Sequence, residues 1–229
     1  ENTGGHQSGC DFDKCFHGGY TQADGGFLHA GVHLLQKGTV IDSLIYIVAY
    51  GSPDFSITQI GNLASLRIGI KNASKEQSEN VLEASALLSG AHIHHKIADN
   101  IIAAIWRKYI LNCAYNITTA RYNRTIGQLR EDPETAAQYE TLVRESWLVS
   151  EAAGAGVPET SINEIIDQFY HKLDPASTSS LQRDIWAGRP SELETFSGYL
   201  VRKAKELSVP VPLSETMYSD LKEIVSKQS

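Results

Sequence analysis

The 229-residue sequence predicts a mostly α-helical protein, in which a short β-sheet is followed by a bundle of six or seven helices. Two patterns predict this fold class. Between residues 39 and 70, apolar and β-branched residues form short runs that are typical of strands. After Gly90, apolar residues recur every three or four positions, which is typical of helices that bury one face.

Composition and charge exclude several classes of protein. Hydrophobic residues make up 41% and charged residues 21%, an ordinary globular mixture rather than that of a disordered chain. The net charge of −7 disfavours a general nucleic-acid binder. No apolar run approaches the roughly 18 residues of a membrane span, no signal peptide is recognisable, and three cysteines do not make a disulfide scaffold. We therefore expect a cytoplasmic protein that binds neither nucleic acid nor membrane.

Residues 1–37 are expected to form an irregular segment rich in glycine and histidine, because they show neither a helical nor a strand period. The run GGHQSG at residues 4–9 is not a dinucleotide-binding fingerprint, since no strand precedes it and no helix follows it. A zinc site is a less favoured alternative, because the spacing fits no standard zinc finger. Its candidate ligands are His6, Cys10, Cys15 and His17.

Residues 38–90 are expected to form a small α/β region. Three short strands are predicted, at residues 39–50, 55–61 and 65–70, with a turn at residues 51–54.

A helix over residues 75–88 follows these strands. Ser74 and Gln77 have the spacing of a capping box, which begins a helix. Gly90 can end it in the left-handed conformation.

Residues 91–229 are expected to be almost entirely helical. Asp132 and Pro133 are the N-cap and first residue of one helix, and the histidines at 92, 94 and 95 are expected in a surface turn. The predicted helices cover about residues 97–120, 133–154, 160 onward, 178–187, 190 onward and 214–227.

A polar stripe interrupts the apolar helix predicted at 97–120. Lys108, Asn112 and Asn116 are four residues apart and therefore lie on one face. A solvated face would favour Glu, Lys, Gln or Arg over asparagine, which is a weak helix former. The stripe therefore suits a polar cleft that orients a ligand beside a cation, with a solvated face as the alternative. Cys113, in the same helix, is expected to be an inert core thiol.

A second polar cluster spans residues 177–184 and is followed by Glu192. Helix caps and a first-turn acid are the simple explanation for these residues, and a catalytic or binding role is the alternative.

Together the two clusters resemble a known family. The motif WRK-x3-N-x3-N at residues 106–116, followed by SSLQ-x-D at 179–184 and GRP-x-E at 188–192, resembles the C-terminal part of the ketopantoate reductases (2-dehydropantoate 2-reductases). Residues 38–69 resemble the last strands of that family's Rossmann-type nucleotide-binding domain. The resemblance covers about 190 residues, from Gly38 to the C-terminus.

The resemblance implies NADPH-dependent reduction of 2-dehydropantoate to pantoate, a step of pantothenate biosynthesis. It also implies a homodimer, and an active site between a Rossmann domain and a helical domain of which this chain carries mainly the substrate side. By position, Lys108 and Glu192 match the catalytic residues, with Glu192 meeting the substrate hydroxyl. The substrate-binding residues implied are Asn112, Asn116, Ser180, at the carboxylate end of the substrate, and Ser177, where the family often has asparagine.

The sequence departs from the family at its N-terminal side. It contains no G-x-G-x-x-G unit, so NADP is implied by the resemblance alone and the cofactor-binding residues stay unassigned; no metal is expected. The alternative function is a non-catalytic helical module for dimerisation or small-acid binding. The expected division is an irregular segment at 1–37, a partial Rossmann-type region at 38–90, and a helical substrate and dimerisation domain at 91–229.

Overall fold

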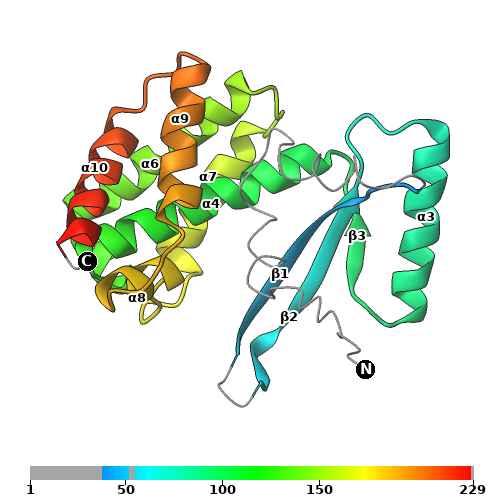
Figure 1. The fold of residues 1–229 in the computed structure, drawn as a ribbon, viewed down its shortest axis with the longest axis horizontal. Coiled ribbons are helices and arrows are strands. Elements are labelled where there is room, and N and C mark those ends of the chain that lie inside the picture. Colours follow the sequence, from blue (N-terminus) through cyan, green and yellow to red (C-terminus); the bar gives the residue numbers. More distant parts are fainter. Residues whose placement is uncertain (1–37, 52–54, 228–229) are drawn as a thin grey trace, which may run out of the picture.

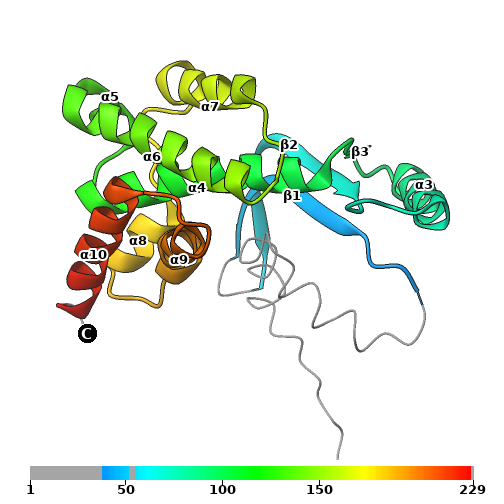
Figure 2. The same ribbon diagram turned by 90° about the horizontal axis from the view of Figure 1, so that it is seen from above.

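The computed structural model describes residues 38–51 and 55–227. They form a small sheet with one helix beside it, and a larger group of helices (Figure 1). Helix α4 (Ile101–Tyr122) connects the two parts, which lie toward its opposite ends (Figure 2). The predicted fold class, mostly α with a short β-sheet, is confirmed.

The sheet has the strand order β1-β2-β3. Strands β1 (Asp42–Gly51) and β2 (Ile57–Gly69) form an antiparallel hairpin, and β3 (His95–Ile97) pairs with β2 in parallel. The prediction of two strands at 55–61 and 65–70 is wrong, because β2 continues through Gly61. This glycine has a φ of 71°, and the register with β1 shifts nearby, between Ile47 and Ala49. The irregular backbone near Gly61 is therefore a β-bulge within β2 rather than a turn between two strands.

Strand β3 lies where the sequence predicts a surface turn, and that part of the prediction is also wrong. A three-residue strand is too short to display a period of two. The strand also lies beyond the boundary that we expect after residue 90, although it joins the sheet. The division into residues 38–90 and 91–229 stays a prediction.

Helix α3 (Lys75–Gly90) begins as predicted. The Gln77 backbone N–H donates to Ser74 Oγ at 3.2 Å, and the Ser74 N–H donates to the Gln77 side chain at 2.9 Å. Its end differs from the prediction, because the left-handed residue is His92, with a φ of 57°, rather than Gly90. The N–H of His92 donates to the carbonyl of Ser89 at 3.0 Å.

Helices α4 and α3 pack on opposite faces of the sheet. A Cβ atom built on Gly69 would lie 3.0 Å from the Cβ of Ile101, so the face of β2 that includes position 69 is turned toward α4. Leu66, an odd number of residues away, lies on the other face beside His95. His95 Nε2 is 2.7 Å from Ser85 Oγ of α3. Because α4 approaches the sheet so closely, only glycine fits at position 69 without displacing a neighbour.

The remaining helices surround the second half of α4. The predicted N-cap at Asp132 is confirmed, since its Oδ1 accepts from the Glu134 N–H at 3.0 Å. The helix expected from residue 190 begins later, as a π-helical turn. The elements are α5 (Ile126–Glu131), which is not predicted, α6 (Pro133–Ala152), α7 (Glu159–His171), α8 (Ser180–Trp186), the π-helix η1 (Glu194–Gly198), α9 (Tyr199–Glu206) and α10 (Pro212–Ser226).

Helix α4 forms the centre of the core. Ile110, Ala114 and Ile117 are fully buried, and so is Cys113. Burial raises the pKa of the Cys113 thiol, whose Sγ donates to the Phe196 carbonyl at 3.2 Å. The prediction of a buried core thiol is therefore confirmed. Among the helices of the described residues, none is long and apolar enough to cross a membrane.

Candidate functional site

The polar stripe of Lys108, Asn112 and Asn116 lies along one face of α4. Successive members are about 6 Å apart along the helix axis, because each residue rises about 1.5 Å. Asn116 is only 6% exposed, and Lys108 and Asn112 are half-buried. Such burial disfavours the solvated-face alternative, because each of these polar groups loses much of its contact with water.

Lys108 is positioned between α4 and strand β1. Its Nζ donates to the backbone carbonyl of Ile45 and lies 5.2 Å from the centre of the Tyr46 ring. Burial lowers the pKa of Lys108 to about 8, because the charged form loses hydration. An ammonium group with this pKa is still mostly protonated at neutral pH, yet it releases a proton more readily than an exposed lysine.

Asn116 carries an acceptor without a partner. Its Nδ2 donates to the carbonyl of Asn112 at 2.9 Å, one helical turn earlier. Its Oδ1 is buried and accepts no hydrogen bond within the described residues. A buried acceptor in this state costs free energy, which a donor such as a ligand hydroxyl would recover.

Hydrogen bonds join the segment that begins at Glu192 to α4, close to the stripe. Tyr109 OH donates to the carbonyls of Thr195 and Phe196 at 3.0 and 3.1 Å. The carbonyl of Glu192 accepts from the N–H groups of these same two residues, at 3.0 and 3.1 Å. Tyr109 directly follows Lys108, so the elements that carry Lys108 and Glu192 are neighbours.

The serine cluster lies at the other end of the stripe. Ser179 is the N-cap of α8, and its Oγ accepts from the Gln182 N–H at 3.0 Å and from Thr119 Oγ1 at 2.7 Å. The simple explanation as a helix cap therefore holds for Ser179. Since Thr119 is eleven residues beyond Lys108, this contact lies about 16 Å along the helix axis from the lysine.

Of the two serines expected in the site, Ser180 is exposed and begins α8. Ser177 is half-buried, and its Oγ donates to the carbonyl of Asp174 at 2.6 Å. The structure thus brings Lys108, Asn112 and Asn116 together, and places the two serines toward the far end of the stripe.

Sequence reasoning missed two residues near Lys108. The guanidinium carbon of Arg67, in β2, lies 6.0 Å from the centre of the same Tyr46 ring that Lys108 approaches. No motif marks these residues in the sequence. Their proximity to Lys108 depends on the pairing of β1 with β2 and on the packing of α4 against both strands.

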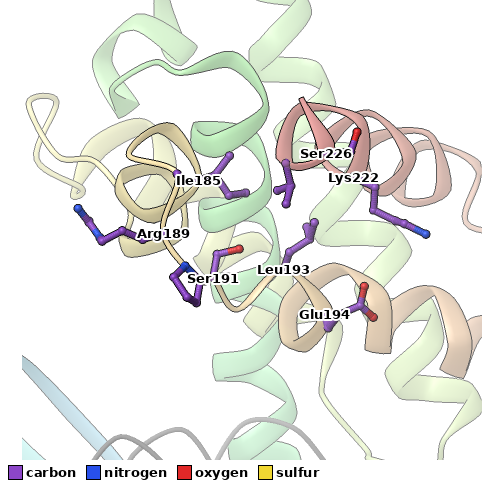
Figure 3. A pocket seen from close by; sticks show the side chains of 10 residues that line it. Ile185, Arg189, Ser191, Leu193, Glu194, Lys222 and Ser226 are labelled. Atoms are coloured by element: carbon purple, nitrogen blue, oxygen red, sulfur yellow. The ribbon is translucent and has the colours of Figure 1, made fainter. Parts of the chain in front are cut away.

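A separate cavity of about 510 Å³ lies between α8, the segment at 188–194 and α10 (Figure 3). The side chains of Ile185, Leu193 and Lys222 surround it. None of the residues that the sequence analysis predicts in the site lines this cavity. Ser191 and Leu193, which are next to Glu192 in the sequence, do line it.

The described residues do not fit the pyrophosphate of a dinucleotide. Two helices follow strands, α3 after β2 and α4 after β3, and neither connection contains a glycine. At each helix start an N–H group already donates to a side-chain cap, Ser74 in α3 and Asn100 in α4. Neither start therefore offers the open array of N–H groups that cradles phosphate.

Within residues 38–51 and 55–227, no group of three or more His, Cys, Asp or Glu side chains could hold a metal ion. The alternative zinc ligands, His6, Cys10, Cys15 and His17, lie outside the described residues, as does the glycine run at 4–9.

Comparison with curated proteins finds oxidoreductases. An uncharacterised oxidoreductase of Bacillus subtilis, YkpB, is 27% identical over 162 residues, which cover 69% of this chain and 52% of the relative. A 2-dehydropantoate 2-reductase of Shigella flexneri is 31% identical over 126 residues, or 54% of this chain and 40% of that enzyme. The chain thus spans about half the length, or less, of the curated relatives it matches.

Solved structures share the fold at low identity. A ketopantoate reductase from Staphylococcus aureus, described as dimeric, has a TM-score of 0.70 at 22% identity and covers 86% of this chain and 66% of its own. A D-mandelate dehydrogenase, solved with NADH and anilino(oxo)acetate, has a TM-score of 0.75 at 16% identity. The match covers 89% of this chain and 65% of the dehydrogenase chain.

A family model extends the comparison to the helical part of the chain. The model described as "Ketopantoate reductase PanE/ApbA C terminal" matches residues 100–225, which is more than half of the sequence and includes α4, the whole polar stripe and Glu192. The chain therefore belongs to the ketopantoate reductase PanE/ApbA family, whose C-terminal domain it contains.

Proposed function

We propose that this chain is the substrate side of an oxidoreductase that reduces the ketone of 2-dehydropantoate to the alcohol of pantoate with NADPH. The observation that carries the proposal is Lys108, a partly buried ammonium group with a pKa near 8 at the start of a buried polar stripe. Family membership supports the same conclusion.

The chemistry assigns a role to Lys108. Hydride addition to a ketone carbon leaves negative charge on the oxygen, which must be stabilised and then protonated. The Lys108 ammonium group supplies the positive field, and its Nζ donates the proton, so that a neutral amine remains. Its lowered pKa brings the donor close to neutral pH, where proton transfer is most effective.

The asparagines and Glu192 orient the substrate in this proposal. The buried Oδ1 of Asn116 accepts a hydrogen bond from a substrate hydroxyl, which gives this orphaned acceptor its partner. Glu192 is a second acceptor for this hydroxyl, because 2-dehydropantoate carries a single hydroxyl group. Asn112, Ser180 and Ser177 complete the proposed binding residues.

A nicotinamide cofactor would supply the hydride, as the relatives suggest, and the resemblance alone favours NADPH over NADH. Because the described residues do not fit a dinucleotide pyrophosphate, the groups that bind the cofactor must lie elsewhere in the functional protein. We further propose a homodimer, as in the S. aureus neighbour.

One observation favours a second candidate function. Since the described residues contain no dinucleotide site, a non-catalytic module that binds small acids or mediates dimerisation would also account for the stripe. Activity measurements separate the two functions.

The test is a reductase assay of the 229-residue chain and of the longest natural chain that contains it. NADPH oxidation is followed with 2-dehydropantoate, and with benzoylformate, the keto acid that corresponds to mandelate. We expect turnover in the natural chain and a higher kcat/KM for 2-dehydropantoate. Preference for benzoylformate would reassign the substrate, and no turnover with either acid would favour the non-catalytic module.

A further inference from the structure

Two cationic side chains approach one aromatic ring beside the stripe. Lys108 Nζ lies 5.2 Å from the centre of the Tyr46 ring, and the guanidinium carbon of Arg67 lies 6.0 Å from it. Cation–π contacts of this length stabilise each cation modestly. They do not neutralise the two positive charges, which repel each other in a partly desolvated place.

The strand register explains why these groups meet. In the antiparallel hairpin, Arg67 is opposite Leu44 and Tyr46 is opposite Ser65, so all four side chains lie on the same face as position 69. That face is turned toward α4, as the contact of Gly69 with Ile101 shows. Leu44, the register partner of Arg67, is only 4% exposed, so this part of the sheet face is covered.

Arg67 differs from the other arginines near the polar stripe. Its Nη1 is buried and donates no hydrogen bond in the part of the chain that the structure describes, and no described ion pair includes it. Arg107 pairs with Glu164 at 3.0 Å, and Arg121 pairs with Asp220 at 2.7 Å. A buried guanidinium donor without an acceptor is costly, and a carboxylate is the acceptor that fits its geometry best.

We propose that Arg67 binds the carboxylate of the substrate while Lys108 acts on the adjacent carbonyl oxygen. This inference rests on the proposed function, and it names a charged ligand for a 2-keto acid. In such an acid the carboxylate is bonded directly to the carbonyl carbon, so the groups that bind the two must be close neighbours. Arg67 and Lys108 share one ring, whereas the contact of Ser179 with Thr119, next to Ser180, lies about 16 Å farther along α4. Arg67 is therefore the carboxylate ligand, and both cations lie beside the Tyr46 ring.

The test compares binding of an acid with binding of its uncharged ester. The 229-residue chain is titrated with the analogue of 2-dehydropantoate that lacks the hydroxyl group and with the methyl ester of that analogue, because the methyl ester of 2-dehydropantoate itself would close to a lactone. Amide chemical shifts are followed by NMR. Arg67→Met is expected to weaken binding of the acid about 10- to 100-fold, as for loss of a hydrogen bond between charged groups, and to leave the ester unchanged. Arg67→Lys should restore part of the affinity. Arg107→Met is the matched control, and it should change neither affinity.

Several outcomes would overturn the proposal. Unchanged affinity of Arg67→Met for the acid, equal losses for acid and ester, or no binding of the acid to the wild-type chain would each do so. If Arg67→Met does not fold, the same comparison is made with Arg67→Lys, whose affinity for the acid alone must fall. If inorganic phosphate binds through Arg67 and the acid does not displace it, the site serves a phosphate and the proposal is wrong.

The proposed function can fail separately. An Arg67-dependent preference for the acid over the ester, in a protein whose natural chain shows no reductase activity, would leave the carboxylate site in place and remove the reductase. Reductase activity with an unchanged KM in Arg67→Met would support the reductase and rule out Arg67 as the carboxylate ligand.

Discussion

Lys108 is partly buried at the contact between α4 and β1. In the proposed mechanism its Nζ both stabilises the alkoxide and donates the proton. Lys108→Ala removes both the field on the developing alkoxide and the proton donor. We expect kcat to fall about 10²- to 10³-fold, the range for loss of one transition-state stabiliser, with cofactor affinity unchanged. Steady-state kinetics of the active natural chain measure this. Lys172→Ala, which removes an exposed lysine paired with Asp167, is the control. A variant that keeps more than about half of the wild-type kcat/KM would remove Lys108 from the active site.

The lowered pKa of Lys108 predicts how kcat/KM depends on pH. Lys108 has a pKa of about 8 and must be protonated to act as general acid. The protonated fraction is nearly complete well below pH 8 and falls about tenfold for each unit well above it. Accordingly, kcat/KM should be constant toward neutral pH and decline above about pH 8. A pH–rate profile tests this, and a decline that begins only near pH 10 would contradict the lowered pKa.

Glu192 should affect a different kinetic constant. A carboxylate that binds a substrate hydroxyl acts in the ground state and in the transition state alike. Glu192→Ala is therefore expected to raise KM for 2-dehydropantoate and to change kcat little. Glu192→Gln, which keeps an acceptor oxygen, should recover part of the loss. An effect on kcat alone would instead assign Glu192 to the chemical step.

At the scale of the helix, α8 depends on Ser179 more than on the neighbouring serine. Ser179 is 2% exposed and caps the helix, whereas Ser180 is exposed. Ser179→Ala removes the cap and the acceptor of Thr119, so we expect the free energy of unfolding to fall by about 1–2 kcal/mol. Ser180→Ala should change it by less than about 0.5 kcal/mol. Urea unfolding compares the two, and equal losses would contradict the assignment of the cap.

Ser180 keeps a separate expectation, because a binding role does not require a role in stability. A change in KM for Ser180→Ala without a change in unfolding would support its place in the substrate site.

At the scale of the whole molecule, the described residues lack a site for the cofactor pyrophosphate. The sequence contains no G-x-G-x-x-G unit, and both strand-to-helix connections of the described residues are closed by their caps. We therefore predict that the 229-residue chain binds NADPH weakly or not at all. Nicotinamide fluorescence should show no saturation at micromolar cofactor. Tight binding would mean that residues outside the described part form a phosphate site that the sequence does not reveal.

The sequence alone was enough to predict several helix starts, the polar stripe and the family. Local signals need only neighbouring residues, so the capping box at Ser74 and the N-cap at Asp132 could be predicted, and so could the buried face of α4. The stripe at Lys108, Asn112 and Asn116 also follows from helical spacing alone. The family resemblance depends on motifs, and the match over residues 100–225 confirmed it.

The tertiary structure decided what depends on contacts between distant segments. Strand β3 exists because β2 offers it a partner, and three residues carry no period of their own. Ser179, rather than Ser180, is buried because Thr119 of α4 meets it. Arg67 and Tyr46 reach Lys108 because the hairpin register puts both on the face that α4 covers. Spacing along a helix is fixed by its regular, hydrogen-bonded backbone, whereas contacts between distant segments are fixed by packing, which no local pattern encodes.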